Sequence, residues 1–216
     1  MIKSHYVVYD CETGGLDEEK NPITQYACVI LEPKNLTEVD RWETFIKPYN
    51  NLEIEQEALD HTMVTMSDIR SGIALKDFVK TAKKFWSQYL GKGAAGRLIS
   101  VGHNVPFDIR FVTYALGLEG EDFSEYFHPH FVDTMVLAKM MWGINGNEKI
   151  RLSDCMERAG LSLTDAHGAM NDVEGTADLF RFFTKKLRSR RGSNIESDIA
   201  DRKRGQEFFE FRCVRD

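Results

Sequence analysis

The sequence predicts an α/β fold in which a mixed sheet of five strands is flanked by helices. Within the first 48 residues, three strand-like segments follow one another with turn residues between them, a pattern typical of an antiparallel meander. From about residue 78 onward, apolar residues at helical spacing alternate with short strand-like runs. Antiparallel strands followed by an alternation of strands and helices predict a mixed sheet with helices on its faces.

The predicted strands share an enrichment in β-branched, aromatic and other apolar residues, with turn residues at their ends. They lie at residues 5–12, 22–32, 39–48, 97–103 and 130–134.

The first predicted helix carries Phe78, Ala82, Phe85 and Tyr89 at helical spacing and ends at the glycine-rich run 91–96. The next begins after Asn104 or Val105 as the N-terminal cap, with Pro106 in its first turn, and ends at Gly117. The remaining predicted helices cover residues 134–142, 152–159 and 170–188.

The length of 216 residues suits one domain with a short appendage. We predict a domain at 1–190 and a charged C-terminal extension at 191–216. The basic residues around 185–191 could contact a phosphate backbone or could form a solvated helix end and tail, and the sequence leaves both interpretations open.

A formal net charge of −6 argues against a general nucleic-acid coat protein and suits a protein that gathers carboxylates around metal ions. The four scattered cysteines have no zinc-site spacing, and we expect small buried thiols. No apolar run is long enough to span a bilayer, and the first residues lack a signal-peptide pattern. These features predict a cytoplasmic protein without a membrane partner.

Two acids end the first predicted strand. Because alternate side chains of a strand share a face, Asp10 and Glu12 are expected to point the same way. Two neighbouring carboxylates repel one another unless a cation holds them, and oxygen ligands at this spacing suit Mg²⁺ or Mn²⁺. The alternative, equally open on this fragment alone, is that Glu12 has already turned into a solvated loop.

Three further residues could complete such a site. Asp108 begins a predicted helix directly after a buried strand, where the helix N-terminus favours a carboxylate; an ordinary first-turn acid is the alternative. His167 and Asp172 would lie about 140° apart on a continuous helix. They can converge only if His167 lies in the preceding loop and Asp172 in the first turn, before the apolar stripe of Val173, Ala177, Phe180 and Leu187.

In order along the chain, these residues form three motifs. They are D-x-E-T-G-G-L at 10–16, H-N-x-x-F-D at 103–108 and H-x-A-x-x-D at 167–172. The set resembles the three motifs of the DEDDh (DnaQ-like) 3′-5′ exonucleases, a family with an RNase H-like fold that includes the DNA polymerase III epsilon subunit and RNase T. Residues 52–64 and 126–134 echo the RNase T branch. Leu16 and His61, however, stand where that branch has Phe, which fits the epsilon-like pattern better.

The resemblance implies two metal ions, Mg²⁺ or Mn²⁺. Asp10, Glu12 and Asp172 would bind one ion, and Asp10 with Asp108, directly or through water, would hold the second. His167 would take a proton from the attacking water near neutral pH. The products would be nucleoside 5′-monophosphates.

The same resemblance implies a set of residues around the terminal nucleotide. Thr13 and the backbone of the two glycines would approach the nucleotide, Leu16 would wedge against its base, and His61 could contact its sugar or phosphate. Phe107 also fits the core stripe with Phe111. The full predicted set is Thr13, Gly14, Gly15, Leu16, His61, Asn104 and Phe107.

Three other acids are expected to be structural. We predict that Asp133 is a strand-end residue with a structural hydrogen bond. Asp154 and Asp165 are expected to be helix caps or first-turn acids.

The leading functional expectation is a metal-dependent 3′-5′ exonuclease on single-stranded DNA. An RNase T-like exoribonuclease is the closest alternative, since discrimination would rest on the 2′-hydroxyl. A catalytically inactive nucleic-acid-binding or scaffold protein is the third; the presence of all four acids and the histidine argues against it. The expected partner is a nucleic-acid 3′ end, with a polymerase or a second copy of the chain as candidate protein partners.

Overall fold

The computed structural model describes residues 4–144, 150–162 and 168–189. The chain divides into two compact units, Met1–Arg181 and Phe182–Asp216. The sheet and all the site residues discussed below belong to the first unit. The described part of the second unit is the end of the last helix.

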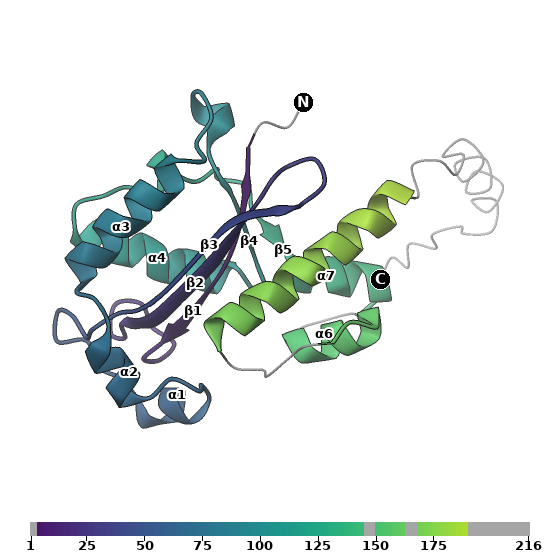
Figure 1. Cartoon of the computed structure of the whole chain (residues 1–216). Coiled ribbons are helices and arrows are strands. Elements are labelled where there is room, and N and C mark those ends of the chain that lie inside the picture. Colours follow the sequence, from purple (N-terminus) through teal and green to yellow (C-terminus); the bar gives the residue numbers. More distant parts are fainter. Residues whose placement is uncertain (1–3, 145–149, 163–167, 190–216) are drawn as a thin grey trace, which may run out of the picture. The chain divides into compact units, whose positions relative to one another are not determined.

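A five-stranded mixed sheet forms the centre of the first unit, in the order β3-β2-β1-β4-β5 (Figure 1). Its strands are β1 Tyr6–Thr13, β2 Ile23–Leu31, β3 Glu38–Phe45, β4 Ile99–Gly102 and β5 Val132–Asp133. β1 pairs with β2, and β2 with β3, in antiparallel fashion, whereas β1 with β4 and β4 with β5 are parallel. The predicted meander and the predicted mixed sheet are confirmed.

The fifth strand is much shorter than predicted. The chain makes an isolated bridge at Phe127 and re-enters the sheet only at Val132. Between these positions the N–H of His130 bonds to Nδ1 of His128 at 3.1 Å and not to β4.

The α-helices include every predicted helix and two short ones that were not predicted. They are α1 Gln56–Asp60, α2 Met66–Ser71, α3 Leu75–Ser87, α4 Pro106–Leu118, α5 Thr134–Trp142, α6 Leu152–Ala159 and α7 Ala169–Ser189. Two 3₁₀ helices, η1 Ala94–Gly96 and η2 Phe123–Glu125, complete the elements. α1 has no buried residue and α2 has one, Ile69, so neither produces a periodic apolar stripe in the sequence.

The structure shows which of the two candidate residues, Asn104 or Val105, caps the N-terminus of α4. Val105 is the N-terminal cap and Pro106 is the first helical residue, where its missing N–H costs nothing. Asn104 precedes the cap in a left-handed conformation, with φ of 67°.

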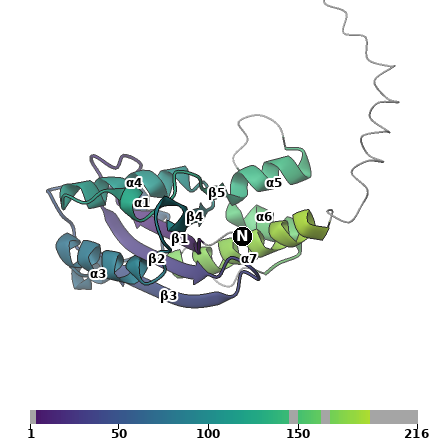
Figure 2. The same cartoon turned by 90° about the horizontal axis from the view of Figure 1, so that it is seen from above.

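The helices cover the two faces of the sheet separately (Figure 1). On one face, Tyr9 and Cys11 of β1 share a core with residues of α3 and α4, including Phe78 and Phe111. On the other face, Val8 of β1 packs in a second core with residues of α7. In Figure 2, α3 and α4 lie on the left and α5 and α6 on the right.

This separation fixes the direction of the paired acids. Side chains alternate along β1, so Asp10 and Glu12 project on the same side as Val8, toward the beginning of α7. The α7 residues of the second core are Ala169, Val173, Ala177 and Phe180. Leu187, predicted to continue this stripe, is instead 54% exposed.

Cys11, Cys28 and Cys155 are buried free thiols, as expected, and Cys213 lies outside the described residues. Among the residues that the structure describes, no helix has the length and apolar character needed to cross a bilayer.

Candidate active site

Three carboxylates converge where β1 meets the first turn of α7. One oxygen from each of Asp10, Glu12 and Asp172 lies within 4.8 Å of the other two. Asp172 donates its backbone N–H to the carbonyl of Gly168 at 3.0 Å, which places it in the first turn of α7, as predicted. His167 lies outside the described residues, so its predicted position remains an expectation.

The electrostatics of this group disfavour three negative charges without a cation. Burial, followed by the charges of Asp108, Glu12 and Asp172, raises the pKa of Asp10 well above its ordinary value. Burial and the neighbouring Asp172 carboxylate raise the pKa of Glu12 to about 7, against a smaller opposing effect of a hydrogen bond with Thr62. A divalent cation would remove this repulsion, and carboxylate oxygens are the ligands that Mg²⁺ and Mn²⁺ prefer. The donor set therefore fits the expected metal.

Asp108 reaches the same region from the other face of the sheet. Its Oδ1 accepts a hydrogen bond from the backbone N–H of Cys11 at 2.9 Å. The parallel ladder between β1 and β4 ends at the pair Val8 and Val101, so this N–H lies beyond the ladder and the carboxylate takes the place of a strand partner.

The Asp108 carboxyl is deeply buried, and its pKa rises to about 8 through loss of solvent, although the N–H of Cys11 opposes the rise. Asp108 is not part of the three-carboxylate group. Its charge nevertheless contributes to the raised pKa of Asp10. The two sets of acids are therefore electrostatically linked, and Asp108 is engaged with the backbone of β1.

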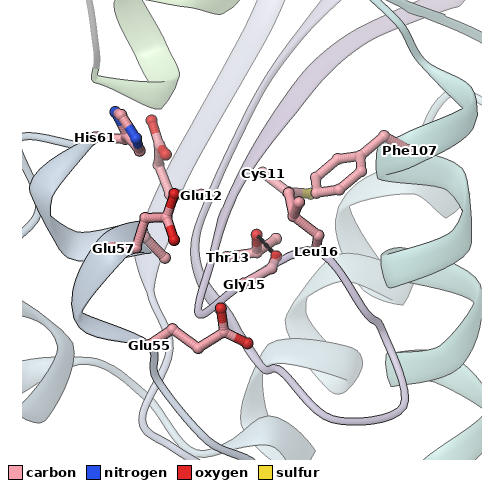
Figure 3. A pocket seen from close by; sticks show the side chains of 10 residues that line it. Cys11, Glu12, Thr13, Gly15, Leu16, Glu55, Glu57, His61 and Phe107 are labelled. Atoms are coloured by element: carbon pink, nitrogen blue, oxygen red, sulfur yellow. Dashed lines mark hydrogen bonds between the residues drawn. The ribbon is translucent and has the colours of Figure 1, made fainter.

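A cavity of about 360 Å³ opens beside the carboxylate group (Figure 3). Leu16 and Phe107 lie on one side of it, and Glu12, Glu57 and His61 on the other. The lining residues are Cys11, Glu12, Thr13, Gly15, Leu16, Glu55, Glu57, Ala58, His61 and Phe107. Glu12 belongs both to the cavity wall and to the carboxylate group, so the two features form one continuous site.

Five of the seven residues predicted around the terminal nucleotide line this cavity. They are Thr13, Gly15, Leu16, His61 and Phe107. Leu16 is apolar and 79% exposed, so its side chain is free to contact a ligand in the cavity. Phe107 serves both purposes that the sequence suggested, since its ring also lies 4.8 Å from that of Phe111, centroid to centroid.

Gly14 and Asn104 are not among the described residues that line the cavity. A Cβ on Gly14 would approach the carbonyl oxygen of Glu53 and Cδ of Pro22 to 2.8 Å, and one on Gly15 would lie 2.5 Å from Asn21. The two glycines therefore admit neighbouring parts of the same chain, a role that the sequence did not reveal.

Asp133 explains the position of Asn104. Its Oδ1 accepts hydrogen bonds from the backbone N–H groups of Asn104, at 3.0 Å, and Met135, at 2.9 Å. The structural hydrogen bond predicted for this acid is confirmed. Asp154 is likewise in the first turn of α6, where it accepts from the N–H of Arg151. Asp165 lies outside the described residues.

The sequence did not identify Glu55, Glu57 and Ala58 as lining residues. They precede His61 in the segment that forms α1. The position of two acids within six residues of a predicted site residue could have suggested them as lining residues. A helix of five residues without a buried side chain gives no periodicity from which their direction could be read.

Comparisons with known proteins agree with this geometry. A family model described as "Exonuclease" (RNase_T) matches residues 7–180. A DNA polymerase III of the PolC type from Pediococcus pentosaceus is 27% identical over 197 residues, covering 91% of this chain and 12% of that polymerase. The chain thus spans only a small part of such polymerases. A ribonuclease T from Marinobacter nauticus is 29% identical over 181 residues, covering 81% of this chain and 79% of that protein.

Solved structures show the same fold at lower identity. Exonuclease I of E. coli, in complex with a dT13 oligonucleotide, superposes with a TM-score of 0.66 at 19% identity, over 82% of this chain and 40% of that one. The nuclease domain of 3′hExo, a DEDDh family member bound to rAMP, gives a TM-score of 0.68 at 12% identity, over 84% and 92% of the two chains. The predicted RNase H-like fold is confirmed. Because the family model covers most of the chain, the chain belongs to the exonuclease (RNase_T) family.

Proposed function

We propose that this exonuclease removes nucleoside 5′-monophosphates from the 3′ ends of single-stranded DNA and depends on Mg²⁺ or Mn²⁺. The observation that carries the proposal is the continuity between the carboxylate group and the neighbouring cavity through Glu12. A terminal nucleotide in the cavity would present its phosphodiester directly to the metal-binding oxygens. The cavity volume of about 360 Å³ suits a small ligand of this kind.

The residues that would hold the metal are the acids named above. Asp10, Glu12 and Asp172 would bind one ion, and Asp10 with Asp108, directly or through water, the second. Two divalent ions at such a site supply charge neutralisation and a bound water of lowered pKa. For Asp108, the hydrogen bond from Cys11 to Oδ1 leaves Oδ2 as the oxygen that would face the ion or its water.

The remaining roles fall to side chains around the cavity. Leu16 would pack against the terminal base, because its exposed side chain lies across the cavity from Glu12 and His61. His61 would contact the sugar or the phosphate. His167 would act as the general base toward the attacking water, a role supported by the sequence motif alone.

A second candidate is an exoribonuclease of the ribonuclease T kind. The relative from Marinobacter nauticus, which the chain covers over most of its length, favours this alternative. Leu16 and His61, where that branch has Phe, favour DNA. The similarity to PolC-type polymerases also supports association with a polymerase, and we include this partner in the proposal.

A matched digestion separates these functions. DNA and RNA oligomers of one sequence, labelled at the 5′ end, are incubated with the protein and Mg²⁺ or Mn²⁺, and both the shortening ladder and the released mononucleotides are identified. We expect stepwise shortening from the 3′ end with faster cleavage of DNA. A clear rate advantage for RNA would replace the leading proposal with the exoribonuclease. Unchanged activity in Asp10→Ala would show that the site is wrongly assigned.

A further inference from the structure

Asn21 is a buried polar residue behind the cavity, with no part in the mechanism described above. Its side chain is 1% exposed, and it lies between two segments that line the cavity, the turn 14–17 and the segment 53–55. Asn21 itself is not among the lining residues.

The amide of Asn21 bonds to both segments. Nδ2 donates to the carbonyl oxygen of Glu53 and to Oε1 of Glu55, each at 3.0 Å, and at 3.4 Å to the carbonyl oxygen of Gly14. Oδ1 accepts the backbone N–H of Asp17 at 3.1 Å. Because three oxygens surround one end of the amide and an N–H faces the other, only one orientation of the group satisfies the site.

These bonds help to hold the turn that carries Leu16. Leu16 is 79% exposed and therefore has little packing of its own to hold it. Its neighbours on both sides contact the amide. Gly15 lies so close that a Cβ there would be 2.5 Å from the Asn21 side chain, and Asp17 donates its N–H to Oδ1.

The same amide also fixes the facing segment. Glu55 lines the cavity and accepts from Nδ2, and its own N–H donates to the carbonyl oxygen of Gly14 at 2.8 Å. A buried amide with four partners is costly to disrupt, although the carbonyl oxygen of Gly14 would keep its bond from the N–H of Glu55.

We propose that Asn21 is a positioning residue for the 3′-terminal nucleotide. By joining the turn that carries Leu16 to the segment that carries Glu55, it holds the cavity open at the distance the terminal base requires. This inference rests on the proposed function, because it assigns the cavity to that nucleotide. Asn21 acts through Leu16 and Glu55 and touches neither the substrate nor the metal-binding carboxylates.

The test compares two variants of Asn21 with a control. Asn21→Ala removes all four bonds, whereas Asn21→Asp keeps the size of the side chain and the acceptor for Asp17 but loses the donors. The control is Ser100→Ala, which removes a hydroxyl that is equally buried and accepts a hydrogen bond from the Tyr9 hydroxyl at 3.2 Å. Ser100 lies in β4 and is not among the residues that line the cavity. Melting temperatures of all variants are measured beside the kinetics.

Each protein is given two oligonucleotides, one with a normal 3′-terminal nucleotide and one whose terminal residue lacks its base. For the normal substrate, both Asn21 variants should raise KM about tenfold, equivalent to about 1.4 kcal/mol of binding free energy, with kcat retained within a few fold. For the substrate without the terminal base, the same variants should behave like the wild type. Ser100→Ala should leave KM unchanged on both.

Three results would overturn the inference: an unchanged KM in both Asn21 variants, an equal rise on both substrates, or the same rise in Ser100→Ala. If the wild-type protein degrades neither DNA nor RNA, the proposed function fails instead. The two failures are distinguishable because only the second concerns the wild-type protein.

Discussion

Replacing Glu12 with Gln is expected to stabilise the metal-free protein near pH 8. Burial and the Asp172 carboxylate raise the pKa of Glu12 from 4.5 to about 7. Above that folded-state pKa the carboxyl is ionised in both the folded and the unfolded chain, so the folded chain bears the full cost of the buried charge. Below its unfolded pKa the group is protonated in both states. Its contribution to stability therefore falls as the pH rises between these two values.

The size of the effect follows from the same two values. A rise from 4.5 to about 7 corresponds to about 3 kcal/mol near pH 8, at about 1.4 kcal/mol for each pH unit, and we take this as an upper bound. Near pH 5 the cost falls to about 1 kcal/mol, because the folded-state carboxyl is then mostly protonated. In a chain of this length each kcal/mol changes the melting temperature by about 2–4 °C, so the largest gain is about 6–12 °C.

The assay is thermal unfolding of Glu12→Gln and wild type in a chelator, near pH 8 and near pH 5. Glu157→Gln, which changes an exposed carboxylate on α6, is the matched control and should alter the melting temperature little at either pH. Added Mg²⁺ or Mn²⁺ should stabilise the wild type more than the variant, since the variant lacks one ligand. A loss of stability in Glu12→Gln near pH 8, or an equal gain at both pH values, would refute the reasoning.

Three further predictions concern the same site. Asp172→Ala should retain its far-UV circular dichroism but lose about a thousandfold in kcat/KM, because a ligand worth several kcal/mol is removed; activity within tenfold of wild type would contradict this. Leu16→Ala should raise KM several fold without changing the melting temperature, since the side chain is 79% exposed, and a lower melting temperature would show that Leu16 is structural. Asp108→Asn keeps an acceptor for the N–H of Cys11 and should fold normally near pH 8, yet it should lose activity; full activity would limit Asp108 to its hydrogen bond.

The sequence predicted the sheet well because its signals are local. The meander of β1, β2 and β3 follows from successive strand-like segments with short turns, and the mixed character of the sheet follows from the later alternation of strands with helices. The first-turn position of Asp172 was also deducible, since the apolar stripe expected from the sequence begins at the next residue, Val173. The expected direction of Asp10 and Glu12 needed only the alternation of side chains along a strand.

The walls of the cavity could not be predicted in this way. Glu55 and Glu57 stand in and beside a helix of five residues without a buried position, so no period reveals which way they point. The closeness of Gly14 and Gly15 to residues 21, 22 and 53 depends on contacts between distant segments of the chain. From the sequence, a glycine pair after a predicted strand indicates only that another group packs closely against the backbone. The structure shows that this group is part of the same chain and not a ligand.

Asp108 shows why the acids of one motif set need not be equivalent. Asp10, Glu12 and Asp172 come together on the α7 side of the sheet, whereas Asp108 arrives from α4 and completes the hydrogen bonding of β1 where β4 no longer pairs with it. A neutral acceptor could satisfy the N–H of Cys11 at lower cost, because burial raises the pKa of the Asp108 carboxyl to about 8. For this carboxyl to be ionised at neutral pH, a compensating charge must lie beside it. The divalent cation proposed beside Asp10 is the partner that would supply this charge.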